Sequence, residues 1–158
     1  MPGRINAITM FMACMLICGC ANNSTGPGTS YIHARFRNQD WDSQQATATR
    51  KSLLSMITIT ATRNTPAGRD SMLLSMANVA KTGTYQMAMS AANGRITLDG
   101  ILYTIGADTG ESQGEITFTK FGDGRIAGTF NMTVYRDGIT SNPPQQVTEG
   151  RFDIALAE

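Results

Sequence analysis

The stretch Ile126-Ala-Gly-Thr-Phe-Asn-Met-Thr-Val134 decides the fold class of this chain. Every second residue, counted from Ile126, is apolar or glycine, and the residues between them are mostly polar. A period of two is typical of a β-strand that buries one face, because successive side chains point to opposite sides. The same alternation returns in Gly150-Arg-Phe-Asp-Ile-Ala-Leu156. One-sided burial of this kind indicates an antiparallel sheet.

Further strands are expected upstream of these two. The alternation is clear over residues 57–61, 72–76, 85–89 and 115–119, and weaker over 31–37, 44–50 and 101–106. A short helix over 43–54 is the alternative for one weaker segment, because Ser43 could cap it. That segment has no apolar stripe, which argues against the helix. We see no internal repeat and no second domain boundary.

Turn residues separate the expected strands. Asn93-Gly94 and Asp99-Gly100 predict tight hairpins, because both central residues of a type I′ turn need positive φ. Gly122-Asp123-Gly124 and Thr65-Pro66-Ala67-Gly68 predict two more turns. The regular spacing predicts an all-β domain, an antiparallel β-barrel or β-sandwich of about 8–10 strands. A lipocalin-like meander is one form that this barrel could take.

The N-terminus predicts export. Residues 1–4 form a short basic head, and residues 5–17 are apolar and uncharged, as in a secretory signal peptide. The apolar run is shorter than the roughly 20 residues that a membrane-spanning helix needs. It ends in Ile17-Cys18-Gly19-Cys20, which resembles the bacterial lipobox. The resemblance implies cleavage after Gly19 and lipid attachment to the sulfur of Cys20. A buried apolar helix of a cytosolic protein is the alternative.

Three segments are therefore expected. They are a lipoprotein signal peptide over 1–19, the lipidated Cys20 with a flexible tether over 20–30, and a single β domain over 31–158. The tether is expected to be flexible because its residues are small and polar. Ala21, rather than Asp, after the lipidated cysteine resembles sorting to the outer membrane. The expected location is the cell envelope, at the periplasmic face or the surface of that membrane.

Cysteine usage and charge exclude several classes of partner. The cysteines are Cys14, Cys18 and Cys20, so the β domain is expected to be disulfide-free and to rely on its hydrophobic core. Once Arg4 is removed with the signal, 12 basic and 12 acidic side chains remain, scattered singly. Nucleic-acid binding depends on clustered Lys and Arg. We therefore expect no nucleic-acid partner.

No catalytic or metal-binding pattern stands out. His33 is the single histidine, and neither a downstream cysteine nor a Gly-x-Ser-x-Gly motif is present to serve as nucleophile. Asp40 and Asp42 alone do not make a calcium loop. Paired carboxylates could hydrolyse glycosides, but Glu111, Glu115 and Glu149 have no distinguishing context. We expect no enzyme activity, no metal and no cofactor.

We expect specific roles for two other residues. Trp41 is the single tryptophan. We expect it to close one end of a barrel, with ligand contact as the alternative. The triplet Asp70-Ser71-Met72 resembles the acceptor of protein O-glycosylation in Bacteroidota, in which Ser71 would be modified.

Four short motifs resemble the small lipoproteins common in Bacteroidota. They are Gly83-Thr84-Tyr85, Gly114-Glu-Ile-Thr-Phe118, Gly128-Thr129-Phe130 and Val147-Thr-Glu-Gly-Arg-Phe-Asp153. Those proteins have no assigned activity, so the resemblance implies only a fold and a cellular location. Gly128 and Gly150 lie on apolar strand faces, where a missing side chain leaves room for a neighbouring ring. Phe130 and Phe152 are candidates for such packing across paired strands.

Three functional classes remain open. We expect a non-catalytic binding module of the envelope, which would hold a small apolar ligand, a glycan or an envelope protein. The alternative is an accessory lipoprotein that acts through protein contacts, and an enzyme is the third class. A large internal cavity would favour a ligand inside a barrel. A filled core with an exposed apolar patch or sheet edge would favour the accessory protein.

Overall fold

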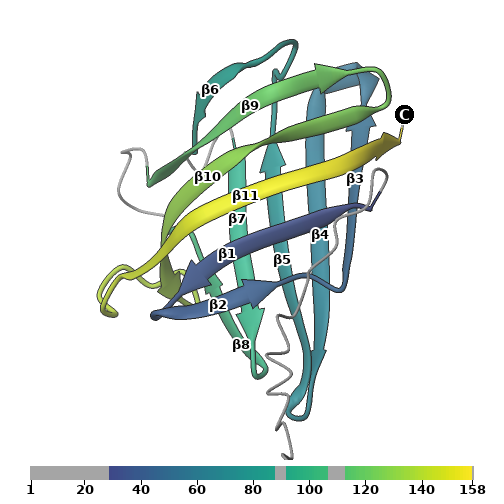
Figure 1. Cartoon of the computed structure of the whole chain (residues 1–158). Helices are drawn as coiled ribbons and strands as arrows, with labels where there is room; N and C mark the ends of the chain where they lie inside the picture. Colours follow the sequence, from purple (N-terminus) through teal and green to yellow (C-terminus); the bar gives the residue numbers. More distant parts are fainter. Residues whose placement is uncertain (1–28, 88–91, 107–112, 158) are drawn as a thin grey trace, which may run out of the picture.

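The computed structural model describes residues 29–87, 92–106 and 113–157 (Figure 1). The expected all-β fold is confirmed, since this part of the chain holds eleven strands and one short 3₁₀ turn, η1 (Ser52–Leu54). The strands are β1 (Tyr31–Phe36), β2 (Gln39–Asp42), β3 (Gln45–Lys51), β4 (Met56–Thr65), β5 (Gly68–Met76), β6 (Gly83–Gln86), β7 (Ala92–Leu98), β8 (Ile101–Thr104), β9 (Gly114–Gly122), β10 (Arg125–Arg136) and β11 (Gln145–Ala157).

Hydrogen bonds join these strands into one mixed sheet, in the order β2-β1-β11-β3-β4-β5-β7-β8-β10-β9-β6. The sheet folds over itself into two layers, which cross obliquely in Figure 1. We call β6, β9, β10, β11, β1 and β2 the front layer, and β3, β4, β5, β7 and β8 the back layer.

The two layers are joined at two short pairings. Strand β10 pairs with β8 through Tyr135 and Arg136, and β11 pairs with β3 through Leu156 and Ala157. The β11–β3 pairing is parallel, whereas the other pairings between described strands are antiparallel. Because each junction is only two residues long, the architecture is closer to two packed layers than to a regular barrel.

The apolar faces of the two layers form one core. In the front layer, residues 126, 128, 130, 132 and 134 are all buried, as the period-two pattern predicts. The ring of Phe118 makes edge contacts with Tyr85, Phe121 and Phe152, with centroids 5.6–6.0 Å apart. Back-layer residues fill the opposite side, among them Ile57, Ile59, Met72, Leu74 and Ile96. The interior is therefore packed with side chains from both layers.

Phenylalanine and glycine alternate in register between β10 and β11. Gly128 pairs with Phe152, and Phe130 pairs with Gly150. A Cβ atom at Gly128 would collide with the carbonyl oxygen of Thr117 and the ring of Phe152. One at Gly150 would collide with the carbonyl oxygen and the ring of Phe130. The expectation that each glycine makes room for a neighbouring ring is confirmed.

The predicted hairpin at Asn93-Gly94 is wrong, because both residues lie inside β7. They pair there with Ser75 and Leu74 of β5. Gly94 is needed for packing rather than for a turn, since an added Cβ would meet the side chains of Met132 and Ile105. The other expected hairpin is confirmed: Asp99 and Gly100 have φ of 50° and 78° and join β7 to β8.

The first part of the chain is more regular than its sequence suggested. Strand β3 occupies most of the segment for which a helix was the alternative, and only the 3₁₀ turn follows it. Strand β2 was not expected, because Trp41 is its one apolar residue. It forms because Arg37 and Asn38, with φ of 51° and 59°, make a tight turn after β1.

We predict that Gly128→Ala destabilises the fold by about 1–3 kcal/mol, since its methyl group would collide with the backbone of β9. Gly94→Ala is the matched control, because its methyl group would meet the side-chain ends of Met132 and Ile105, which can move. Urea unfolding followed by circular dichroism measures both. A loss of stability at Gly94 equal to or larger than that at Gly128 would contradict the argument.

Candidate functional site

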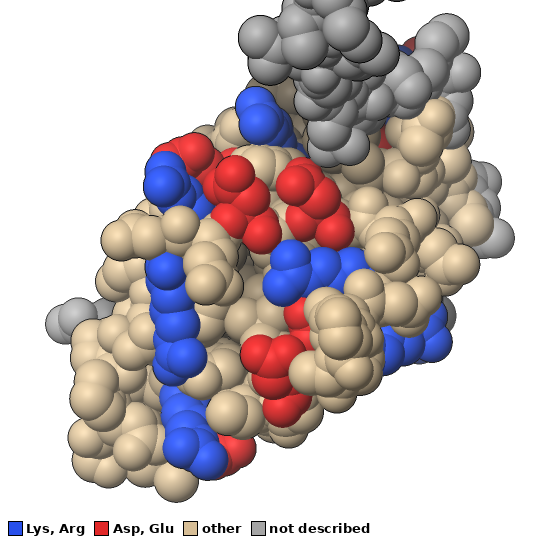
Figure 2. Space-filling view, turned by 60° about the horizontal axis from the view of Figure 1, so that its bottom comes forward, with Lys and Arg blue, Asp and Glu red and all other residues tan. Residues whose placement is uncertain are grey.

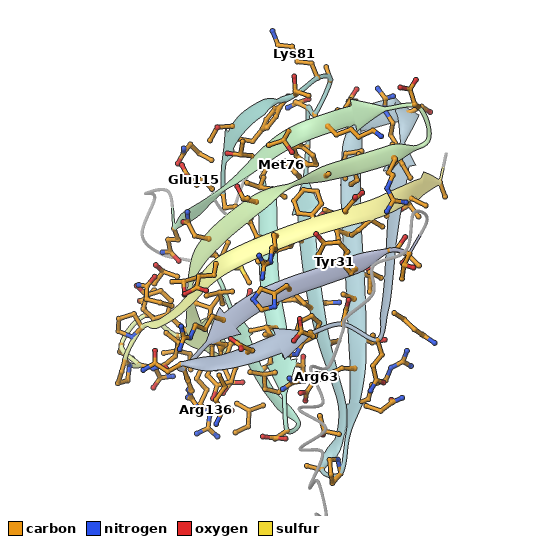
Figure 3. All side chains as sticks on the ribbon, in the orientation of Figure 1. Tyr31, Arg63, Met76, Lys81, Glu115 and Arg136 are labelled. Atoms are coloured by element: carbon orange, nitrogen blue, oxygen red, sulfur yellow. The ribbon has the colours of Figure 1, made fainter. Side chains whose placement is uncertain are left out.

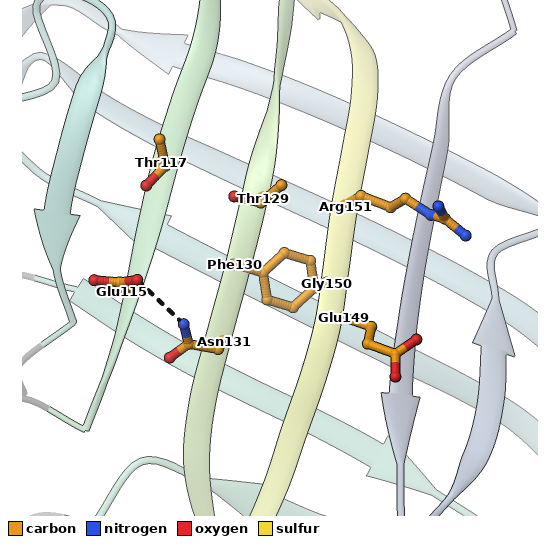
Figure 4. A pocket seen from close by; sticks show the side chains of 8 residues that line it. All are labelled: Glu115, Thr117, Thr129, Phe130, Asn131, Glu149, Gly150 and Arg151. Carbon is orange, nitrogen blue, oxygen red and sulfur yellow. Dashed lines mark hydrogen bonds between the residues drawn. The ribbon is translucent and has the colours of Figure 1, made fainter.

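A shallow groove of about 450 Å³ lies on the outer side of the front layer (Figure 4). It crosses the middle of β9, β10 and β11. Its lining consists of Glu115, Thr117, Thr129, Phe130, Asn131, Glu149, Gly150 and Arg151. Phe130 and Gly150 are buried and form the floor, while the other six residues are polar or charged.

The strand register places one row of polar side chains across the whole front layer. Thr117 of β9 lies opposite Thr129 of β10, which lies opposite Arg151 of β11. On the β9 side the row continues to Thr84 of β6, whose hydroxyl lies 2.8 Å from that of Thr117. On the other side, Arg151 lies opposite His33 of β1.

His33 makes a hydrogen bond with Asp42, which ends this row. Its Nδ1 atom lies 2.7 Å from Oδ1 of Asp42 on β2. Six strands thus contribute one side chain each, and with strands about 4.8 Å apart the row is about 24 Å long. We call this set the threonine row: Thr84, Thr117, Thr129, Arg151, His33 and Asp42.

A second row runs beside the first and carries the acidic groups. Glu115 of β9 lies opposite Asn131 of β10, whose Nδ2 donates to Glu115 Oε1 at 3.3 Å. Glu149 of β11 follows, and its Oε1 accepts from Nη1 of Arg35 at 3.3 Å. Arg35 lies opposite Asp40 of β2. We call this set the acidic row: Glu115, Asn131, Glu149, Arg35 and Asp40.

A β-bulge brings Glu149 into the acidic row. The register of β11 shifts at this point against both β10 and β1, and Glu149 adopts a φ of 53°. A bulge inserts one extra residue into a strand and re-aims its side chain. Glu149 thereby lines the groove at β11, on the far side from Glu115, and its carboxylate extends toward β1 (Figure 4).

The charges around the groove are mixed in sign. The lining residues include two acidic ones, Glu115 and Glu149, and one basic one, Arg151. Seen from the end of the molecule, acidic and basic side chains also lie side by side (Figure 2). Within the described part of the chain, no three His, Cys, Asp or Glu side chains are grouped so that they could hold a metal ion.

The structure brings together residues that the sequence left without context. Glu115 and Glu149 share the groove, and His33 and Asp42 form a hydrogen bond at the end of the threonine row. Glu111 lies outside the described residues. The sequence reasoning missed Thr117, Thr129, Asn131 and Arg151. Their alternation showed that they point outward, but only the strand register shows that they are neighbours.

Trp41 lies away from the groove, in the core. It is 1% exposed, and the guanidinium of Arg63 lies 5.6 Å from its ring. Arg63 is held in turn by the buried Asp70, which accepts from its Nε atom at 2.8 Å. Trp41 is therefore a core residue, and its expected role of closing one end of a barrel stays a prediction. Ligand contact at Trp41 stays a prediction.

The modification sites stay predictions as well. Gly19 and Cys20 lie outside the described residues, as does most of the expected tether. Ser71 lies within β5 and is half-buried, between Thr62 of β4 and Thr97 of β7. In the described residues, no helix has the length and apolar character to cross a membrane.

Comparison with known proteins gives a family but no activity. A search of curated proteins found no similar sequence, and a search of solved structures found no similar fold. A family model described as a domain of unknown function, DUF6252, matches residues 28–153. The matched region includes both rows of the groove and all strands except the end of β11. The chain therefore belongs to the DUF6252 family.

Proposed function

We propose that this protein is a lipid-anchored binding module of the bacterial cell envelope, and that it holds a glycan in the groove of the front layer. The observation that supports this most is the pair of parallel polar rows across β9, β10 and β11. They present hydrogen-bonding side chains from adjacent strands on a rigid surface, which suits an extended ligand with many hydroxyl groups.

The chemistry of the lining matches that of a sugar. Sugar hydroxyls both donate and accept hydrogen bonds. Glu115 and Glu149 accept, Arg151 donates, and Asn131 and the two threonines can do both. Both carboxylates are already oriented, one by Asn131 and the other by Arg35. A ligand would therefore meet groups whose positions are set before it binds.

The filled core argues against a small apolar ligand inside the fold. Buried side chains from both layers occupy the interior, and phenylalanine rings cover Gly128 and Gly150 of the front layer. The groove, in contrast, is open and polar. A glycan on the outside therefore fits better than an apolar molecule on the inside.

The cellular location of the protein is also part of the proposal. The basic head, the apolar run and the lipobox-like Ile17–Cys20 support an exported chain that is anchored through Cys20. Such an anchor would place the domain at the outer membrane. Weak binding suffices there, because many copies on one surface engage a polymeric glycan with increased avidity.

The glycan proposal predicts which substitutions in the groove weaken saccharide binding. Asn131→Ala and Glu149→Gln should each weaken binding to a saccharide about two- to tenfold, because one hydrogen bond contributes roughly 0.5–1.5 kcal/mol. Thr133→Ala is the matched control, since Thr133 lies further along β10 and outside the lining. A glycan array identifies the saccharide, and isothermal titration calorimetry measures its affinity.

Two results would contradict the glycan proposal. One is the absence of any saturable binding by the unmutated protein to envelope or host saccharides. The other is binding that Asn131→Ala and Glu149→Gln leave as strong as the Thr133→Ala control does.

The anchor predicts a separate result. Cys20→Ser should abolish the incorporation of radiolabelled palmitate and release the protein from the membrane fraction of its host, because the acylated sulfur is removed. Cys18→Ser is the control and should keep both the label and the membrane location. If Cys20→Ser stays labelled and membrane-bound, Cys20 is not the site of attachment.

An accessory protein is the second candidate function. The front layer ends in two edge strands, β2 and β6. An edge strand can pair with a strand of another protein. Chemical crosslinking in cells would distinguish the two, because an accessory protein gives a defined protein adduct through β2 or β6 that Asn131→Ala does not affect.

A further inference from the structure

A second pocket lies at one end of the two layers, apart from the groove. It has a volume of about 220 Å³ and lies where the β1–β2 turn, β8 and the β10–β11 loop meet. Its lining consists of Arg37, Tyr103, Arg136, Asn142, Pro143 and Gln145. Figure 3 shows Arg136 at this end, well separated from Glu115 of the groove. The two pockets have no residue in common.

Arg37 is held rigidly at this pocket. Its guanidinium carbon lies 5.2 Å from the ring centre of Phe36 and 5.0 Å from that of Tyr103. Its Nη2 donates to the hydroxyl of Tyr103 at 2.8 Å, and its Nε donates to Oε1 of Gln145 at 3.0 Å. Ring contacts and hydrogen bonds fix the plane of the guanidinium, and its other N–H groups remain as donors.

Arg136 brings a second guanidinium to the same pocket. Its side chain is 61% exposed, and its Nε atom makes a long ion-pair contact of 3.7 Å with Oδ2 of Asp137. The backbone around it is well held. The carbonyl oxygen of Arg136 accepts from Nδ2 of Asn142 at 3.0 Å, and the amide of Asp137 donates to the carbonyl of Leu102. The loop therefore keeps Asn142 beside Arg136.

The lining is cationic and rich in donors. It contains two arginines and no carboxylate. The hydroxyl of Tyr103 accepts from Arg37, so its own proton is available for a ligand. The amide of Asn142 and the N–H groups of both arginines add further donors. Convergent donors with two positive charges suit an oxyanion, because guanidinium groups pair with the oxygens of carboxylates and phosphates.

We propose that this pocket binds the oxyanion of a small ligand, a carboxylate or a phosphate, between Arg37 and Arg136. The site differs from the glycan groove in position and in charge. Its existence therefore does not depend on the groove being a glycan site.

The test uses the full-length chain, purified in detergent. Inorganic phosphate and glucuronate are the two anionic probes, and glucose is the neutral control. Titrations are followed by NMR through the side-chain amide signals of Asn142 and Gln145. We expect at least one anion to shift these signals with saturation, and glucose to leave them unchanged. Which anion does so distinguishes a phosphate site from a carboxylate site.

Arg136→Gln should weaken the binding of that anion about tenfold, since it removes a charged donor. Because the side chain of Arg136 is exposed, this substitution is expected to leave the fold intact, so a loss of binding would reflect the pocket itself. Arg69→Gln is the control, because it removes the same charge outside the lining. The proposal is overturned if neither anion shifts the two signals with saturation, or if both variants weaken binding equally. Anion shifts confined to Asn131 in the groove would overturn it too.

Discussion

The exchange of phenylalanine and glycine between β10 and β11 is the packing constraint on which the rest of the molecule depends. Each ring lies over the glycine of the neighbouring strand, so the two backbones keep their spacing while large apolar groups fill the core between the layers. The ring of Phe152 also contacts that of Phe118, which extends the same cluster to β9. The outer side of these three strands is the groove. The geometry of its polar rows therefore rests on a register that the buried rings help to set.

Much of the fold follows from local pattern. The period-two alternation located β4, β5, β9, β10 and β11, and paired turn residues located the hairpin at Asp99-Gly100. The same reasoning failed at Asn93-Gly94, because Gly94 is required by tertiary packing and not by a turn. The side chains of Met132 and Ile105 occupy the space next to Gly94, and a packing contact of this kind leaves no pattern in the local sequence. Strand β2 was missed for a related reason, because its one apolar residue, Trp41, is buried by partners from other strands.

The candidate site was less predictable than the fold. Alternation indicates which residues point outward, but it does not say which outward residues of different strands are neighbours. The threonine row joins residues as far apart in the sequence as His33 and Arg151, and a shift of one residue in any pairing would break it. The bulge at Glu149 adds a second difficulty. A positive φ at a glutamate has no sequence signature, yet Glu149 adopts this conformation where it lines the groove.

Strand β11 has a consequence for the order in which the chain can fold. It lies between β10 and β1 in the front layer and also touches β3, so one strand holds together pieces from both ends of the chain. Tyr31 pairs with Asp153, and this contact closes a loop of nearly the whole domain. Contacts between residues so far apart form slowly, because the entropy of loop closure is lost before any contact is gained. Strand β1 can pair early with β2, but it lacks its second partner until residues 145–157 are available. The front layer is thus expected to stay incomplete during synthesis until β11 has been made, whereas the pairings among β3, β4 and β5 can form earlier.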